Sequence, residues 1–257
     1  MDAILRARGL VKEFQRTRAV DGVDVTVHSG ERVALLGPNG AGKTTTLMML
    51  MGVIEPDEGW VEVAGHRLPK ERSEALGNVG FSAGYMPLAE RMRVREFLKM
   101  YGELYGIHRP QSRIIAGLEH FRIGHLEDAM CTELSSGQRT LIGIVKATLH
   151  RPRLLVLDEP TASLDPDVAL RVRNGLRSFC DEQGMALLIT SHNMLEIERL
   201  CERVVFLSAG RVVADDSPDA VAERYGRGDL EEVFLHLAGV EPAEHREPAP
   251  QETDRPT

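Results

Sequence analysis

Apolar and polar residues alternate near the start of the chain, where Val23, Val25 and Val27 are separated by single polar positions. This period of two is typical of a strand that buries one face. A continuous apolar run over 33–36 (VALL) ends in a glycine-rich segment, and the run that follows over 44–54 (TTTLMMLMGVI) has the length of a helix. Strand, loop and helix in this order predict the opening βα unit of a sheet.

The second half of the chain repeats this alternation of strands and helices. Apolar runs predict strands at 154–158 (LLVLD), 185–190 (MALLIT) and 203–208 (RVVFLS). Helices are expected between them, at about 166–183 and 194–201. Strands separated by helices are predicted to lie parallel in one sheet.

Two segments depart from this pattern. A turn over 55–59 (EPDEG) precedes the alternating run WVEVAG, which predicts a small antiparallel sheet beside the core. From Val94 to about Leu149 the spacing is helical, with no strand pattern. The fold class is therefore predicted to be α/β, with a parallel-sheet core, a flanking antiparallel β-subdomain and an all-helical insertion.

One domain is expected over 1–240. Its core is predicted at about 1–83 and 150–240, with a helical subdomain at about 84–149. The acidic, proline-rich stretch over 241–257 has no apolar periodicity and is predicted to be a disordered tail.

Composition narrows the class of protein. The net charge of −8 argues against a nucleic-acid binder, which usually carries a basic excess. No apolar run reaches the roughly 18 residues of a membrane span, and no signal-peptide pattern opens the chain. Three widely spaced cysteines indicate a reducing compartment rather than a disulfide framework. We therefore expect a cytoplasmic protein whose membrane role, if any, comes through a partner.

The glycine-rich segment fits the P-loop pattern, so the core is predicted to be that of a P-loop NTPase. Glycines let backbone N–H groups surround phosphate oxygens, and the helix that follows turns its positive end toward the same anion. Lys43 would reach the β- and γ-phosphates of ATP, and the Thr44 hydroxyl would bind Mg²⁺. A glycine-rich turn without a ligand is the alternative. The predicted nucleotide-binding residues here are Gly37, Pro38, Asn39, Gly40, Ala41, Gly42, Lys43, Thr44 and Thr45.

Two acids and a histidine follow predicted strands at the same edge of the sheet. Asp158 ends the run LLVLD and Glu159 follows it, at the edge where ligands of parallel sheets bind. Asp158 would hold Mg²⁺, and Glu159 would polarise the attacking water as general base. His192, after the run MALLIT, would donate to the γ-phosphate. The alternatives are a strand ending in an acidic turn and a structural histidine.

Together these motifs resemble one family, the ATP-binding cassette (ABC) ATPases, over about 3–238. The run Leu134 to Gln138 (LSSGQ) resembles the family's signature, and Ser163, Leu164 and Asp165 resemble its D-loop. The resemblance implies a head-to-tail dimer in which each ATP lies between the P-loop of one copy and the signature of the other. Read without the resemblance, LSSGQ is a helix-capping loop.

Carried over by position, the resemblance implies that Ser135, Gly137 and the first-turn amides of the helix that starts there bind the γ-phosphate in trans, with Gln138 also among the nucleotide-binding residues. It implies that Asp165 links the two sites across the dimer.

The chain departs from the family pattern at three positions. Phe14 is the candidate for the aromatic residue that stacks on adenine, where the family most often has tyrosine. Ser136 replaces the first glycine of the signature. Gly84 falls where the family has a glutamine that touches Mg²⁺ and the attacking water, so metal coordination there would rely on water and hydrolysis would be slower or coupled differently.

The resemblance implies an ATP hydrolase that drives transport, peripheral on the inner face of the cell membrane and bound to integral-membrane subunits. The ending over 230–239 (LEEVFLHLAG) resembles cassettes that are separate subunits of exporters for multidrug, antibiotic or polysaccharide substrates. Two alternatives stay open. One is a regulatory cassette that binds ATP with little turnover, and the other is a cassette ATPase that acts on nucleic acid.

Overall fold

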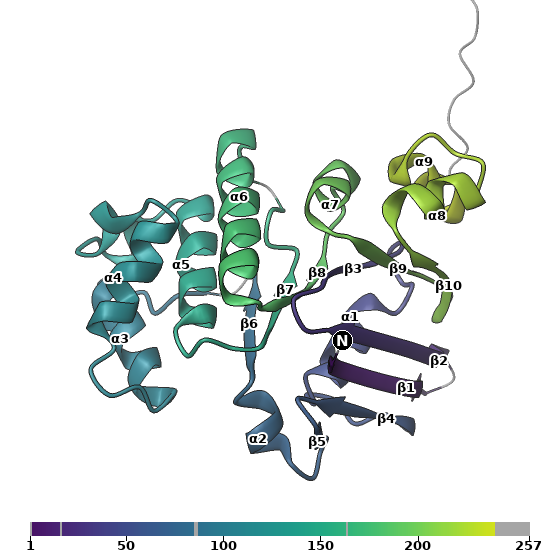
Figure 1. Cartoon of the computed structure of the whole chain (residues 1–257), viewed down its shortest axis with the longest axis horizontal. Helices are drawn as coiled ribbons and strands as arrows, with labels where there is room; N and C mark the ends of the chain where they lie inside the picture. The colour runs from purple at the N-terminus through teal and green to yellow at the C-terminus, as the bar shows by residue number, and fades with distance from the viewer. Residues whose placement is uncertain (1, 16, 85–86, 163, 240–257) are drawn as a thin grey trace, which may run out of the picture.

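The computed structural model describes residues 2–15, 17–84, 87–162 and 164–239 (Figure 1). The predicted D-loop residue Ser163 and the predicted tail over 241–257 lie outside these ranges. The strands are β1 (Ala3–Phe14), β2 (Thr17–His28), β3 (Arg32–Leu36), β4 (Glu58–Val63), β5 (His66–Arg67), β6 (Val79–Ala83), β7 (Leu154–Asp158), β8 (Ala186–Thr190), β9 (Arg203–Ser208) and β10 (Arg211–Asp216).

Helices connect the strands and form the insertion. The α-helices are α1 (Lys43–Leu50), α2 (Arg72–Leu76), α3 (Val94–Leu104), α4 (Gln111–His120), α5 (Ser136–Thr148), α6 (Pro166–Gln183), α7 (Met194–Leu200), α8 (Pro218–Arg224) and α9 (Leu230–Leu237). Two 3₁₀ turns, Gly124–Leu126 and Cys131–Glu133, lie between α4 and α5. Among the described residues, no helix combines the length and the apolar character that a bilayer span requires.

The strands form two sheets. One has the order β10-β9-β3-β8-β7-β6, with β10 antiparallel at its edge and the other pairs parallel. The other has the order β2-β1-β4-β5 and is antiparallel throughout. In Figure 1, α3, α4 and α5 lie together at the left and the antiparallel sheet lies at the lower right. The predicted α/β class, with its antiparallel flank and helical insertion, is confirmed.

Both faces of the parallel sheet are buried, which explains why its strands are apolar runs. On β7, Leu155 and Leu157 pack with the helical insertion, whereas Leu154 and Val156 pack with the antiparallel sheet. The predicted inward residues of β2 (Val23, Val25 and Val27) are at most 1% exposed. One apolar cluster therefore continues from the sheet into the insertion, and the division into core and helical subdomain stays a prediction.

The helix predicted over 44–54 is shorter than its apolar run, and this expectation was wrong at its C-terminal end. The helix stops at Leu50, and Gly52 follows with φ +61°. The amides of Val53 and Ile54 both donate to the Met48 carbonyl, which closes the end of the helix. A glycine in the left-handed region is a common helix terminator, and it outweighs the apolar character of the next residues.

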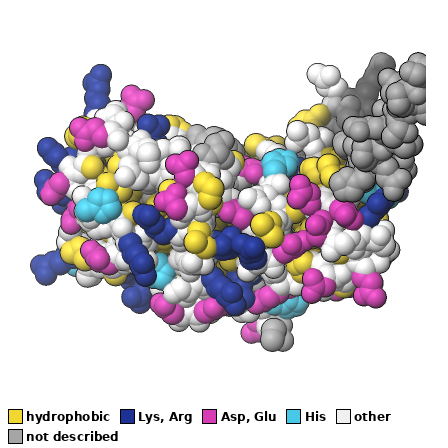
Figure 2. Space-filling view, turned by 90° about the horizontal axis from the view of Figure 1, so that it is seen from above, with side chains coloured by type: hydrophobic (Ala, Val, Ile, Leu, Met, Phe, Trp, Pro, Cys, Tyr) yellow, Lys and Arg dark blue, Asp and Glu magenta, His cyan; other side chains and the backbone are white. Residues whose placement is uncertain are grey.

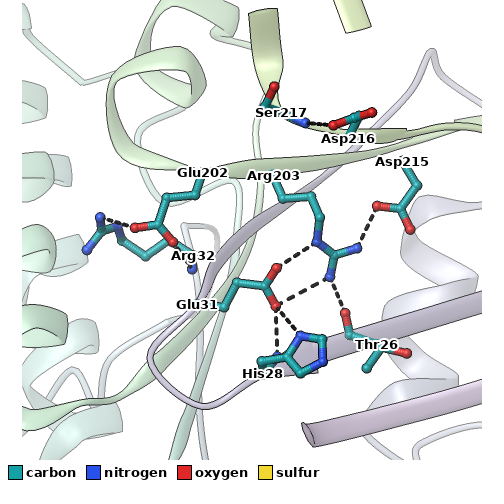
Figure 3. Close-up of polar contacts among 9 residues, drawn as sticks. All are labelled: Thr26, His28, Glu31, Arg32, Glu202, Arg203, Asp215, Asp216 and Ser217. Atoms are coloured by element: carbon teal, nitrogen blue, oxygen red, sulfur yellow. Dashed lines mark hydrogen bonds and ion pairs between the residues drawn. The ribbon is translucent and has the colours of Figure 1, made fainter. Parts of the chain in front are cut away.

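An ion network closes the amino-terminal edge of the parallel sheet (Figure 3). Arg203, the first residue of β9, donates to Glu31 Oε1 at 2.7 Å, to Asp215 Oδ1 at 2.5 Å and to the Thr26 carbonyl. Arg32, the first residue of β3, pairs with Glu202 at 2.5 Å and also with Asp181. Strands β2, β3, β9 and β10 are therefore tied together at this edge.

Candidate active site

The opposite, carboxyl-terminal edge of the parallel sheet holds a cavity of about 550 Å³. The residues that line it are Ala19, Asn39, Gly40, Gly42, Lys43, Thr44, Thr45, Asp158, Glu159 and His192. They come from β2, the loop after β3, the start of α1, the end of β7 with the residue after it, and the segment after β8. The fold thus brings together the P-loop, the acidic pair and the histidine, three motifs that are far apart in the sequence.

The loop after β3 needs glycine for two reasons. Gly37, Gly40 and Gly42 have φ values of +145°, +79° and +98°, which side chains rarely tolerate. A Cβ at Gly37 would lie 2.2 Å from the Leu207 carbonyl oxygen, and one at Gly42 would lie 2.4 Å from that of Ala19. The loop is therefore wedged against two other backbone segments, while Gly40 faces open space.

Lys43 begins α1, and its ammonium lies over the loop that precedes it. Its Nζ donates to the carbonyls of Gly37 at 2.6 Å and Pro38 at 3.1 Å. Burial lowers the pKa of Lys43, while the nearby carboxylates of Glu159 and Asp158 partly offset this effect. An anion in the cavity would favour the charged form of this lysine.

The acidic pair is held by Thr190, the last residue of β8, which sequence reasoning missed. The Thr190 hydroxyl donates to Asp158 Oδ1 at 2.6 Å, and the Glu159 amide donates to the same hydroxyl at 3.0 Å. Asp158 and Thr190 are buried. The sequence did offer a signal for Thr190. It is a polar residue that ends an apolar strand, directly before Ser191 and His192.

Glu159 and His192 lie in direct contact in the lining of the cavity. His192 Nε2 lies 3.1 Å from Glu159 Oε1. Burial raises the pKa of Glu159, the histidine opposes this shift, and the neighbouring charge of Asp158 adds to it. A carboxylate with a raised pKa is suited to accept a proton from water.

The histidine also contacts α9, whose link to the site no motif had indicated. The ring of Phe234 on α9 meets the His192 ring edge-on, with centroids 6.1 Å apart, and packs against the buried Phe206 of β9. A second cavity of about 530 Å³ shares Glu159 and His192 and reaches Glu231 of α9. Only tertiary packing reveals this link.

Thr44 and Asp158 fit the magnesium role that the sequence predicted for them. Both line the same cavity beside Glu159, and they offer a hydroxyl and a carboxylate oxygen. Mg²⁺ is usually held by one or two such protein oxygens, with water and substrate phosphates completing its shell. The donor set is therefore chemically suitable.

The signature residues lie elsewhere, at the start of α5 in the helical insertion. Ser135 caps this helix: its hydroxyl accepts from the Gln138 amide at 3.3 Å, and Gln138 Oε1 accepts from the Ser135 amide at 2.9 Å. Gly137 is buried, and a Cβ there would lie 2.6 Å from Val168 Cγ1 on α6, whereas Ser136 is exposed. This difference explains why only the first glycine of the signature is replaced.

The structure does not bring every predicted site residue to the cavity. Ser135, Gly137 and Gln138 are not among its lining residues, and neither is Phe14, which ends β1 with 45% of its surface exposed. Gly37, Pro38 and Ala41 belong to the loop without lining the cavity. Asp165 is exposed at the N-cap position of α6.

Comparison with known proteins places the chain in a family. The family model described as "ABC transporter" matches residues 20–162. "Nod factor export ATP-binding protein I" of Burkholderia lata is 36% identical, covering 93% of this chain and 78% of the relative. The protein of the same name from Rhizobium sp. strain N33 is also 36% identical, covering 88% and 75%.

Solved structures agree with these relatives. "Structure of ATP binding subunit of ABC transporter" matches with a TM-score of 0.82 and 28% identity, covering 91% of this chain and 99% of that one. The ADP conformation of another ABC transporter cassette supports the fold, with a TM-score of 0.79 at 23% identity and coverage of 94% and 100%. The chain therefore belongs to the ABC transporter family, as an ATP-binding subunit with the ATPase activity of that family.

Proposed function

We propose that this chain hydrolyses ATP at the carboxyl-terminal edge of its parallel sheet and so drives export through separate integral-membrane subunits. The observation that carries the proposal is that Lys43, Asp158, Glu159 and His192 line one cavity. The names of the relatives, which describe ATP-binding proteins of an exporter, support the direction of transport.

In the proposed mechanism, the loop amides and Lys43 hold the phosphates of ATP. Thr44 and Asp158 would hold Mg²⁺, which supplies positive charge against the charge that develops on the transferred phosphoryl group. Glu159, with its raised pKa, takes a proton from the attacking water. His192 donates to the γ-phosphate and orients the Glu159 carboxylate, which lies 3.1 Å away.

A second copy of the chain would complete the site. Ser135, Gly137 and Gln138 lie in the helical insertion and do not line the P-loop cavity, so one copy supplies only part of the predicted contacts. A head-to-tail homodimer would place the capped start of α5 of one copy against the γ-phosphate held by the other. Asp165 would then lie at the dimer interface, and Phe14 would stack on adenine.

The charge of the chain argues against a nucleic-acid partner. Acidic and basic side chains are mixed on the face that Figure 2 shows, and the whole chain carries a net charge of −8. A nucleic-acid footprint would gather positive charge. We therefore propose a subunit that lies on the cytoplasmic face of the membrane, where its transport partners are.

The proposal is tested by steady-state phosphate release from Mg-ATP. We expect Glu159→Gln to lower turnover by about 10²- to 10⁴-fold, the range typical of a lost general base, while ATP still binds. Glu31→Gln, which makes the same chemical change at the opposite edge of the sheet, is the matched control and should keep turnover per folded molecule.

Undiminished turnover in Glu159→Gln would contradict the assigned base. A wild-type chain that binds ATP without turnover would instead favour the regulatory alternative, for which Gly84 is the sequence feature.

A further inference from the structure

Gly84 packs directly against the loop that begins after β7 with Glu159 and Pro160, called the acidic loop below. It follows β6, whose last residue, Ala83, is paired in register with Asp158 of β7. The Gly84 amide donates to the Asp158 carbonyl at 3.0 Å. A Cβ at position 84 would lie 2.5 Å from the carbonyl oxygen of Glu159 and 3.9 Å from Pro160 Cα. The obstacle is backbone, which cannot swing away as the end of a flexible side chain could.

The backbone of Glu159 is itself constrained. Its φ is +50°, a left-handed value that is uncommon for a residue other than glycine. Its amide donates to the Thr190 hydroxyl, and its carbonyl accepts from the Ala162 amide at 3.2 Å. The loop is thus held by Thr190 on the β8 side and by Gly84 on the β6 side.

We propose that Gly84 is a positioning residue: the absence of a side chain there lets the end of β6 close on the acidic loop and fixes the direction of the Glu159 carboxylate. This inference rests on the proposed role of Glu159 as general base. A glutamine placed at position 84 would therefore displace the acidic loop through its Cβ instead of simply adding a ligand.

Two substitutions distinguish close packing at Gly84 from the alternative that the chain simply lacks a side-chain ligand at this position. If the chain only lacks a useful amide, Gly84→Gln should raise turnover and Gly84→Ala should change little. If close packing is what matters, both variants displace Glu159 through the same Cβ. Both should then lower kcat by about 10- to 100-fold, since small misplacements of a reacting group have effects of this size.

Gly102→Ala is the matched control. Its Cβ would lie 2.5 Å from Pro110 Cβ, a comparable clash within the helical insertion and away from the acidic loop. We expect it to lower the melting temperature by an amount similar to that of Gly84→Ala while leaving kcat, the KM for ATP and the acid limb of the pH–rate profile unchanged. In Gly84→Ala that limb should move, and KM should stay within about 3-fold of wild type.

The Glu159→Gln background gives a second test. If Gly84 acts through Glu159, adding Gly84→Ala to Glu159→Gln should cause no further loss of kcat. Should Gly84→Ala not fold, Thr190→Val loosens the same loop by replacing the hydroxyl that accepts from the Glu159 amide with a methyl group of similar size, and it should lower kcat at least about 10-fold.

An unchanged or raised kcat in Gly84→Gln and Gly84→Ala would overturn the inference while leaving the proposed function standing. If Thr190→Val has to replace Gly84→Ala, an unchanged kcat in that variant would likewise overturn the inference and leave the proposed function standing. Absence of hydrolysis by the wild-type chain would overturn both.

Discussion

The two edges of the parallel sheet use charge in opposite ways. At the amino-terminal edge, burial alone would raise the pKa of Glu31 and lower that of Arg203. Hydrogen bonds between the two residues and with their neighbours outweigh burial and favour both charged forms (Figure 3). At the carboxyl-terminal edge, burial prevails, so the pKa of Lys43 is lowered and that of Glu159 is raised.

The charges at the amino-terminal edge therefore contribute to stability, whereas those at the carboxyl-terminal edge are suited to function. Charges that are satisfied inside the protein hold β2, β3, β9 and β10 together. Charges that are only partly compensated cost stability, but they can respond to a bound phosphate or accept a proton. Since the strands between the edges are apolar on both faces, their ends are where charge can reach water.

Replacing the cation at each edge, Lys43 or Arg203, should give the largest difference between an effect on turnover and an effect on stability. Lys43→Met should lower ATP turnover by about 10²- to 10³-fold, since it removes a donor that stabilises charge on the transferred phosphoryl group. It should leave the free energy of unfolding equal or higher, because burial disfavours the charged lysine. Phosphate release and urea unfolding of the same preparation measure both quantities. Retained turnover would mean that the Lys43 ammonium does not stabilise the transferred phosphoryl group.

The converse change is Arg203→Met at the amino-terminal edge. It leaves the carboxylates of Glu31 and Asp215 without their shared partner, and it should lower the free energy of unfolding by about 2–3 kcal/mol. Turnover per folded molecule should be unchanged. A loss of turnover larger than the loss of folded protein would mean that the two edges are coupled.

The pH dependence of stability should also differ in sign between the edges. The folded pKa of Glu31 lies below its unfolded value of about 4.3, so its contribution is present above that pH and is lost as pH falls through the folded pKa. The folded pKa of Glu159 is raised, so its contribution is full below about pH 4.3 and is lost as pH rises through the folded pKa.

At pH 7, Glu159→Gln should therefore melt at a higher temperature than wild type, and Glu31→Gln at a lower one. Calorimetry of the nucleotide-free proteins measures both shifts. Melting-temperature shifts of the same sign in the two variants would contradict the opposite pKa shifts of Glu159 and Glu31.

A smaller effect is expected from Phe234→Leu on α9. The ring contact with His192 is lost, so the histidine should orient Glu159 less well and kcat should fall by about 2- to 10-fold, the equivalent of one aromatic pair. Phe234→Tyr keeps the ring and serves as control. If kcat is unchanged in the leucine variant, α9 has no part in the site.

The sequence predicts most of the site because its chemistry follows the ends of apolar strands. The P-loop, Asp158, Glu159 and His192 lie at or just beyond the carboxyl ends of strands of one parallel sheet, so topology alone brings them to one edge. The strands at 154–158 and 203–208 and the helix over 166–183 match their predicted ranges for the same reason.

What the sequence could not provide are contacts that depend on tertiary packing. Nothing local to Gly84 indicates that it touches the Glu159 backbone, and nothing in α9 points to His192. The end of α1 was misjudged because the apolar run continues past Gly52. The role of Gly137 depends on Val168, which lies on a different helix.

The decisive measurement is the size of the Glu159→Gln protein, by light scattering with and without Mg-ATP. Because hydrolysis is blocked while the P-loop and the signature are intact, the protein should be a monomer that becomes a dimer on adding Mg-ATP. A protein that binds Mg-ATP and stays monomeric would contradict the claim that a second copy completes the site at the carboxyl-terminal edge.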